Sequence, residues 1–237
     1  VDDEESPGVL SNSFLSPVGL TLKKLRPRPT DFIEANRLLH ELDSSYEADK
    51  KRQQVSYTLA NIYSALRARM QDYAPGAMRQ LLQYFVFDCW IGNTDRHHEN
   101  WGLLIYSSQK TPDSFYRLTP SYDHGAGLAA TRTPAAKHEI LRDGIERFYE
   151  KGRSALYDPS VSGHKAMSFR KTLEACFTFE RAQFGAANAC LKIARRICAI
   201  QKADIDRMLC RLPDGWGFTE IDRKFTLRYL SHSRDVI

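Results

Sequence analysis

The stretch that decides the fold is residues 91–101, which read IGNTDRHHENW. Polar side chains occupy every position from Asn93 to Asn100, and they follow directly on an apolar run that ends at Trp90 and Ile91. A hydrophobic core does not absorb so many consecutive polar side chains, so we expect a surface loop. Loops held by a rigid scaffold commonly carry binding or catalytic residues.

The segments on either side of this loop predict where it lies. Residues 77–90 are apolar on nearly every face, which predicts a buried central helix. Residues 101–106 and 115–118 predict two strands joined by a polar turn, a small hairpin that ends just before Asp123. Because a hairpin returns the chain to its starting point, Asp123 is expected beside the loop.

The rest of the chain has mostly helical periodicity. Thr30 predicts the N-cap of a helix that begins near Asp31, with apolar residues at positions 32, 35, 38, 39 and 42. A charged break and a second helix over 55–70 follow. Residues 121–137 predict a loop, and later helices are expected near 140–149, 168–184, 187–200, 203–211 and 220–231. The predicted fold class is therefore α+β, predominantly helical.

Composition excludes several classes of protein. Among 237 residues, 42% are hydrophobic and 27% charged, which is typical of a globular domain, and no apolar run is long enough for a membrane span. The net charge of +5 is too small to indicate direct nucleic-acid binding. The five cysteines form no CxxC pair, which favours reduced thiols and a cytoplasmic location.

Three oxygen-bearing side chains suggest phosphoryl transfer. The carboxylate of Asp95 can orient or deprotonate a hydroxyl, while the amide oxygen of Asn100, five positions on, can turn toward a metal ion. Asp123, in the sequence YDHG, supplies a second oxygen ligand of the kind that holds Mg²⁺ against nucleotide phosphates.

The segments 91–101 and 120–123 resemble the catalytic and metal-binding motifs of HipA-like serine/threonine kinases. The resemblance implies the C-terminal lobe of a protein-kinase-like fold, with a small β-hairpin at the active site. It implies Asp95 as catalytic base, His97 near the phosphates, and Asn100 and Asp123 as Mg²⁺ ligands in the ATP site. Backbone around Ser13 and Phe14 is expected to meet the adenine, since residues 8–15 resemble the hinge-side strand of that family.

The resemblance also divides the chain and implies partners. Residues 1–18 would be the remnant of an N-terminal lobe and hinge strand, and residues 19–237 the C-terminal lobe. The implied acceptor is a serine or threonine hydroxyl of a protein. The resemblance also allows an antitoxin-like DNA-binding partner, as in toxin–antitoxin pairs, but the sequence does not decide whether one exists.

Two departures from the family pattern stand out. Glu99 occupies a position where lysine is expected, and we hypothesise that Arg96 compensates for the missing positive charge. The sequence contains no glycine-rich phosphate loop and no strand lysine of the kinase type. We therefore expect these parts in a region preceding Val1, and little activity from this chain alone.

Four alternatives remain open from the sequence. Residues 95–100 also fit the Asp-Arg-His-x-x-Asn pattern of phosphatidylinositol kinases, which would make the acceptor a lipid. The chain could instead be a pseudokinase or binding module. Histidines 97 and 98 with Asp95 and Asp123 could form the transition-metal site of a hydrolase. Finally, Asp95 and Asn100 could simply cap backbone amides, a role that such side chains often play.

Overall fold

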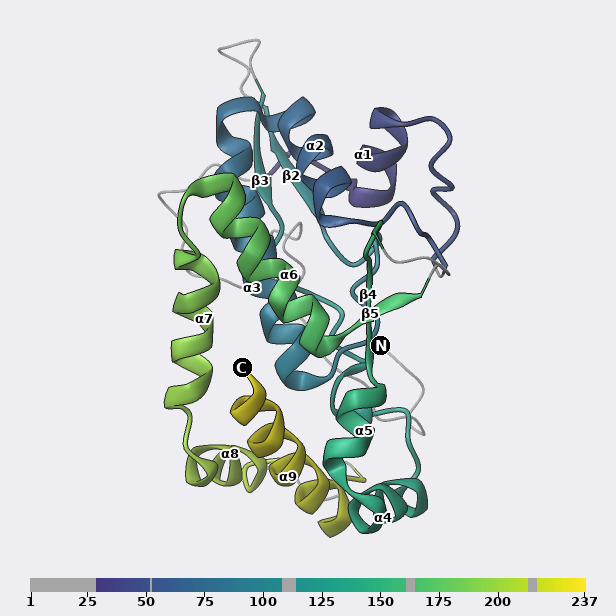
Figure 1. Cartoon of the computed structure of the whole chain (residues 1–237), viewed down its shortest axis with the longest axis vertical. Coiled ribbons are helices and arrows are strands. Elements are labelled where there is room, and N and C mark those ends of the chain that lie inside the picture. Colours follow the sequence, from purple (N-terminus) through teal and green to yellow (C-terminus); the bar gives the residue numbers. More distant parts are fainter. Residues whose placement is uncertain (1–28, 52, 108–113, 161–164, 213–216) are drawn as a thin grey trace.

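The computed structural model describes residues 29–51, 53–107, 114–160, 165–212 and 217–237 (Figure 1). The elements in chain order are β1 (Asp31–Glu34), α1 (Ala35–Leu42), α2 (Leu59–Met70), the short helix η1 (Gln71–Tyr73), α3 (Ala74–Ile91), β2 (Gly102–Tyr106), β3 (Phe115–Leu118), η2 (Gly127–Ala129), α4 (Pro134–Asp143), α5 (Ile145–Lys151), β4 (Arg153–Tyr157), β5 (Ala166–Ser168), α6 (Phe169–Phe184), α7 (Asn188–Ala199), α8 (Lys202–Leu209) and α9 (Glu220–Val236). The described part is thus mostly helical with two small antiparallel sheets, an α+β fold.

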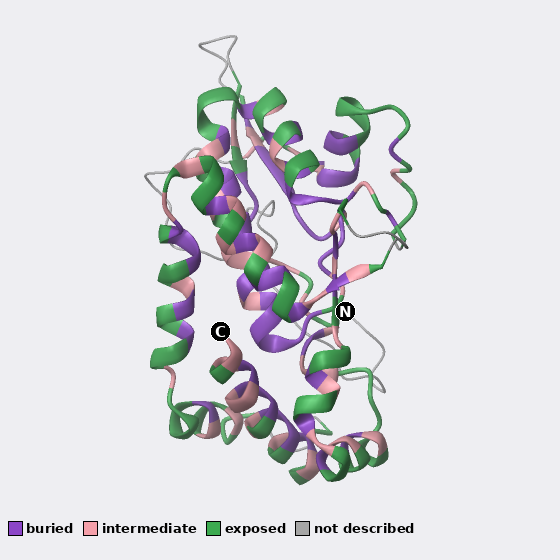
Figure 2. Cartoon of the chain, in the orientation of Figure 1, coloured by how far each residue is buried: buried purple, intermediate pink, exposed green. Residues whose placement is uncertain are grey.

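Helix α3 lies at the centre of the molecule, as its apolar sequence predicts. Leu81, Leu82 and Val86 have no exposed surface, and helices α2, α6, α7 and α9 all pack against α3. In Figure 2 the outer faces of the surrounding helices are exposed while their inner faces are buried. A helix that other helices pack against in this way has little freedom to move. It therefore forms a stiff base for the loop that follows it.

Helix α3 ends at Gly92, which adopts a left-handed conformation with φ of 68°. A Cβ atom at this position would lie 2.6 Å from Cζ of Tyr229 on α9 and would overlap its hydroxyl. Both the backbone angle and the close approach therefore require glycine. The loop over residues 93–100 starts from this fixed point.

The three-stranded sheet has the order β1-β2-β3, and all its pairs are antiparallel. The two strands predicted downstream of the loop are present as β2 and β3, with Leu103 opposite Leu118. The predicted start of the first helix is wrong, because residues 31–34 form β1 and pair with Gly102–Ile105. Thr30 caps no helix; its hydroxyl donates to the carbonyl of Ile105.

Other predicted boundaries also shift. The helix predicted near 140–149 is wrong as a single element, since the chain breaks at Gly144 between α4 and α5. Helix α4 begins at Pro134, inside the segment predicted as a loop, with the Thr133 hydroxyl capping it. The two-stranded sheet of β4 and β5 was not predicted. Ser154 on β4 and Thr172 on α6 share a buried hydrogen bond of 2.7 Å that holds this sheet on α6.

Among the described residues, no helix combines the length and the apolar character needed to cross a bilayer. All five cysteines are free; Cys89, Cys176 and Cys190 are buried, and Cys198 and Cys210 are exposed. The prediction for residues 1–18 lies outside the described residues, as do Ser13 and Phe14.

Candidate functional site

The loop between α3 and β2 is pinned by its own side chains. The Asn93 amide donates to Oδ1 of Asp88 at 2.9 Å and accepts from the backbone N–H of Asp95 at 3.1 Å. The Asn100 amide donates to the carbonyl of Asp95 at 2.6 Å. These bonds fix the backbone at residue 95 and leave its carboxylate, whose side chain is 40% exposed, free for another role.

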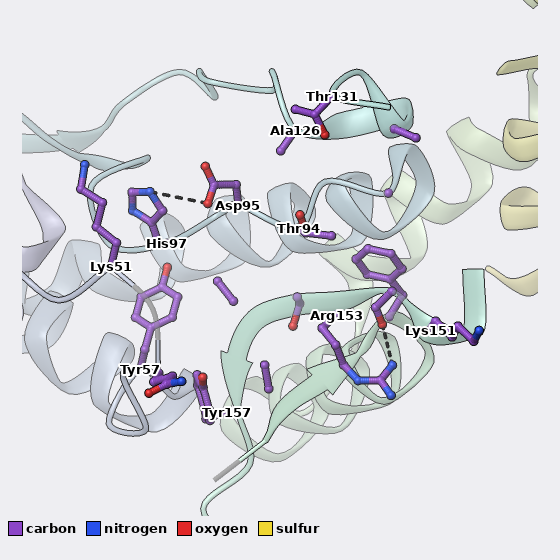
Figure 3. Close-up of a pocket in the computed structure, with 18 of the residues that line it drawn as sticks. Lys51, Tyr57, Thr94, Asp95, His97, Ala126, Thr131, Lys151, Arg153 and Tyr157 are labelled. Atoms are coloured by element: carbon purple, nitrogen blue, oxygen red, sulfur yellow. Dashed lines mark hydrogen bonds and ion pairs between the residues drawn. The ribbon is translucent and has the colours of Figure 1, made fainter. Parts of the chain in front are cut away.

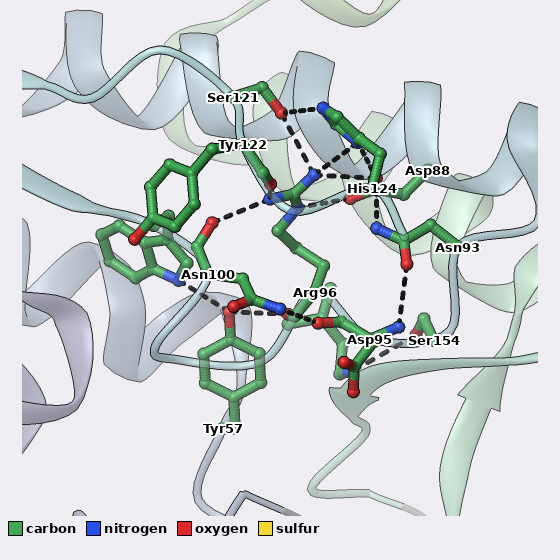
Figure 4. Close-up of polar contacts among 12 residues, drawn as sticks. Tyr57, Asp88, Asn93, Asp95, Arg96, Asn100, Ser121, Tyr122, His124 and Ser154 are labelled. Carbon is green, nitrogen blue, oxygen red and sulfur yellow. Dashed lines mark hydrogen bonds and ion pairs between the residues drawn. The ribbon is translucent and has the colours of Figure 1, made fainter. Parts of the chain in front are cut away.

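Arg96 joins this loop to the segment after β3 (Figure 4). Its guanidinium binds both oxygens of Asp88 on α3, at 2.7 and 3.0 Å. One nitrogen, Nη1, donates to the carbonyl of Asn100 at 2.7 Å and to that of Tyr122 at 2.6 Å. Because a single nitrogen holds both carbonyls, the guanidinium clamps the two loops together. Asn100 lies on the first loop, and Asp123, the residue after Tyr122, lies on the second.

The environment of Arg96 contradicts the hypothesis that it compensates for the missing lysine. Arg96 is only 1% exposed. Burial opposes its charge, but the hydrogen bonds and charge of Asp88 outweigh this and raise the pKa of Arg96 above its usual value. The guanidinium is committed to Asp88 and to backbone carbonyls, so it does not face the cleft.

A different cation lies near the expected position. Nζ of Lys51 is 2.6 Å from the carboxylate of Glu99, and the side chain is 58% exposed. The hydrogen bond and charge of Glu99 raise the pKa of Lys51, and the charge of Asp95 adds to this effect. Glu99 therefore brings a lysine from the segment between α1 and α2 to the rim of the loop.

His97 is oriented toward Asp95. Its Nδ1 accepts a hydrogen bond from the backbone N–H of Glu99 at 3.2 Å, which places the proton of the neutral ring on Nε2. Nε2 lies 3.8 Å from Oδ1 of Asp95. An N–H group thus points toward the carboxylate that the sequence predicts as catalytic.

The neighbouring histidines have structural roles. Nδ1 of His98 bonds to the hydroxyl of Tyr46, and the ring is buried. Burial, together with the charge of His97, lowers the pKa of His98 to about 4, so the ring is neutral at pH 7. His124 accepts from Arg96 through Nδ1 at 3.0 Å and bonds Ser121 through Nε2 at 3.1 Å, as expected of a structural residue.

Asn100 and Asp123 fit the ligand set that Mg²⁺ prefers. The nitrogen of the Asn100 amide is committed to the Asp95 carbonyl, while its oxygen accepts no hydrogen bond from the part of the chain that the structure describes. The Asp123 residue is exposed, and its carboxylate forms no ion pair within that part. Two uncommitted hard oxygen donors on clamped loops are suitable for a magnesium ion that also keeps water and phosphate ligands.

Two alternatives lose their basis. Within the described ranges no three His, Cys, Asp or Glu side chains gather closely enough to hold a metal, which argues against the transition-metal site. The capping alternative fails for Asp95, because no backbone N–H among the described residues donates to its carboxylate, which lies 3.8 Å from Nε2 of His97.

A pocket of about 810 Å³ opens in front of Asp95 (Figure 3). Its lining includes Thr94, Asp95 and His97 from the loop, and Arg153 and Tyr157 from β4. In Figure 3 the loop residues lie on one side of the space and the β4 residues on the opposite side. The exposed carboxylate of Asp95 is therefore accessible to a molecule that enters this pocket.

Sequence reasoning missed the residues that organise the site. Asp88 is 3% exposed and anchors Arg96 and Asn93. A carboxylate inside an apolar helix was the available signal, because a buried charge needs a partner. Tyr57, which donates to the Arg96 carbonyl at 3.1 Å and accepts from Nε1 of Trp101 at 2.7 Å, carried no comparable signal.

Comparison with known proteins identifies the architecture. The structure is similar to the crystal structure of the Helicobacter pylori proinflammatory kinase CtkA, with a TM-score of 0.63 and 20% sequence identity. The similarity covers 87% of this chain, which spans 66% of the length of that chain. Among curated proteins no sequence matches. The model of the HipA-like C-terminal domain matches residues 28–204, so this chain belongs to the HipA-like C-terminal domain family.

Proposed function

We propose that the protein containing this chain is an ATP-dependent kinase that transfers the γ-phosphate of ATP to a serine or threonine hydroxyl of a protein. The observation that carries the proposal is the clamp of Arg96 on the carbonyls of Asn100 and Tyr122. The clamp holds the loop that carries Asp95 and Asn100 beside the segment that carries Asp123, which supports our proposal that the three side chains act in one site. Family membership and the kinase-like fold support the same function.

In the proposed reaction the acceptor hydroxyl enters the pocket in front of Asp95. The hydroxyl oxygen bonds to the γ-phosphorus, the bond from that phosphorus to the bridging oxygen breaks, and ADP leaves. Asp95 orients the hydroxyl and takes its proton. The N–H on Nε2 of His97, directed at Asp95, steadies the carboxylate and, in this proposal, reaches toward the transferred phosphate.

Asn100 and Asp123 would hold Mg²⁺, which supplies neutralisation of the phosphate charge when bound. Ser13 and Phe14 remain the proposed adenine contacts, and an antitoxin-like partner remains part of the proposal on family resemblance. Positioning and charge neutralisation account for most of the catalysis expected from such a site.

The direct test is phosphorylation by the full-length protein with radiolabelled ATP and Mg²⁺. Asp95→Ala and Asp123→Ala should each abolish labelling, whereas Asp143→Ala, which changes an exposed carboxylate at the end of α4, should leave it intact. Undiminished labelling by either site variant would overturn the assignment of roles. Failure of the wild-type protein to bind Mg²⁺-ATP would instead favour the pseudokinase alternative.

The acceptor class needs its own arm in this test. We expect the label to appear on protein and not on phosphatidylinositol vesicles. Transfer to the vesicles alone would replace the protein acceptor by a lipid one, as the Asp-Arg-His-x-x-Asn pattern of residues 95–100 allows.

A further inference from the structure

The pocket in front of Asp95 is lined by an excess of basic side chains. Lysine or arginine occupies four lining positions: Lys51, Arg132, Lys151 and Arg153. Among the described residues that form the lining, Asp95 carries the single carboxylate. The basic residues come from three different segments, before α2, before α4 and around the start of β4, so the excess is a property of the pocket and not of one charged stretch of sequence.

The four basic side chains differ in whether they already form hydrogen bonds or ion pairs within the protein. Lys51 is paired with Glu99 at 2.6 Å, and Nη1 of Arg153 donates to the carbonyls of Glu150 and Gly152, each at 2.8 Å. The side chains of Arg132 and Lys151 are exposed and form no hydrogen bond or ion pair with the part of the chain that the structure describes. At least two cations of the pocket are thus available to a ligand.

The pocket lies next to Asp95, so it receives the part of the substrate that surrounds the acceptor hydroxyl. If Asp95 receives the acceptor hydroxyl, that hydroxyl must come within about 3 Å of its carboxylate. The groups adjacent to the hydroxyl then occupy the same pocket and meet the basic side chains around it. A concave site with like charges on its walls concentrates the opposite charge and repels its own sign.

We propose that this pocket is the acceptor subsite and that it selects an acidic protein segment, in which aspartate, glutamate or phosphorylated residues flank the serine or threonine. The proposal rests on the proposed function, because it assigns the substrate class of the same site. Carboxylates of the segment pair with Arg132 and Lys151, while Asp95 holds the hydroxyl.

Binding tests the proposal without relying on catalysis. The probes are two fluorescein-labelled peptides with one serine, flanked by glutamates in the first and by glutamines at the same positions in the second. The full-length protein should bind the glutamate peptide at least tenfold more tightly, and the affinity should fall as salt is raised. The double variant Arg132→Gln/Lys151→Gln should lose most of this preference.

A matched control removes the same charge elsewhere. Lys192 and Arg195 are exposed on α7, outside the pocket lining, so Lys192→Gln/Arg195→Gln lowers the net charge equally. Its affinity for the glutamate peptide should equal that of the wild type. Equal affinity of the wild type for both peptides, or equal losses in both double variants, would overturn the proposal.

Kinetics separates this proposal from the one on which it rests. With the glutamate peptide as acceptor, Arg132→Gln/Lys151→Gln should raise KM at least fivefold. Tight binding of the glutamate peptide without any phosphate transfer would sink the kinase function and leave the acidic subsite standing. Phosphate transfer to both peptides with no preference between them would support the kinase function and reject the acidic subsite. Preference for phosphoinositide vesicles over the glutamate peptide would assign the basic pocket to a lipid headgroup and reject the acidic segment.

Discussion

The guanidinium of Arg96 lies against the carboxylate of Asp88 with two bonds, Nε to Oδ2 at 2.7 Å and Nη2 to Oδ1 at 3.0 Å. Both side chains are almost fully buried, at 2% and 4% exposure. A bidentate pair of this kind fixes orientation as well as distance. The central helix, the loop with Asp95 and the segment with Asp123 therefore share one electrostatic anchor.

Removing one partner of this pair should cost more stability than removing both. Arg96→Met leaves the Asp88 charge buried without a counter-ion, and we expect a loss of about 3–5 kcal/mol in the free energy of unfolding. Urea denaturation measures it. The double variant Arg96→Met/Asp88→Leu should recover part of the loss, because no orphaned charge remains.

An exposed pair provides the comparison for that experiment. Arg207 and Asp204 on α8 are 3.3 Å apart, with side chains that are 66% and 51% exposed. Arg207→Met should lower stability by no more than about 1 kcal/mol. Equal losses for the buried and the exposed arginine would mean that Arg96 is not the anchor described above.

Substitution of Gly92 should disturb the entry to the loop. Alanine at this position requires a left-handed backbone and places its Cβ against the ring of Tyr229. We expect Gly92→Ala to lower the free energy of unfolding by about 2 kcal/mol or more. Gly76→Ala is the matched control on the same helix, since a Cβ there meets nothing within 4 Å. The control should be neutral or slightly stabilising in thermal melts, by at most about 1 kcal/mol.

Acid should destabilise the protein through His98. Its pKa is lowered to about 4 by burial and by the charge of His97, whereas an unfolded histidine titrates near pH 6.5. Between these two pKa values the unfolded chain binds a proton at His98 that the folded protein does not bind. The free energy of unfolding therefore falls as the pH decreases from 6.5 to 4. Below pH 4 both states are protonated, and His98 causes no further loss. The expected total is about 3 kcal/mol.

Denaturant titrations between pH 8 and pH 4 measure this dependence. His98→Gln should be less stable at pH 8, because the bond to Tyr46 changes, yet should lose less stability on acidification than the wild type. Parallel pH profiles for the two proteins would be inconsistent with a neutral buried ring.

Asp95→Asn should separate activity from stability. The carboxylate contacts His97 at 3.8 Å and is partly exposed, so the isosteric amide removes little structural support. We expect phosphate transfer to fall by about 10²–10⁴-fold, with the free energy of unfolding within about 0.5 kcal/mol of the wild type. Single-turnover labelling and urea titration of the same samples give both quantities, and a large loss of stability would reassign Asp95 as a structural residue.

The sequence predicts the central features because their signals are local. The apolar run before Gly92 predicts a buried helix and the polar run after it predicts a loop, and both are present. The expectation that the loop lies on the surface is wrong, because most of its polar side chains are buried, Arg96 and His98 at 1% exposure each. The strands at residues 101–106 and 115–118 have β-prone composition and a polar turn between them. Family membership and the α+β class follow from the same segments.

Features that depend on distant pairing were not predictable in the same way. Phe32 matches the helical spacing of α1, and only the partner strand β2 turns residues 31–34 into a strand. The basic pocket collects residues from segments more than 70 positions apart, Lys51 and Arg132 among them. The role of Arg96 was mispredicted for another reason: the sequence does not show that its side chain turns back to Asp88, eight positions earlier on α3, and is held inside.

The contacts of α9 with the end of α3 bear on how the protein is made. The Ser233 hydroxyl donates to the carbonyl of Trp90 at 2.7 Å across 143 positions of sequence, and Tyr229 closes over Gly92 nearby. A ribosome that has already extruded residues 91–101 has not yet built the helix that locks their entry point. In a nascent chain the entry to this loop therefore stays unset until α9 has been synthesised.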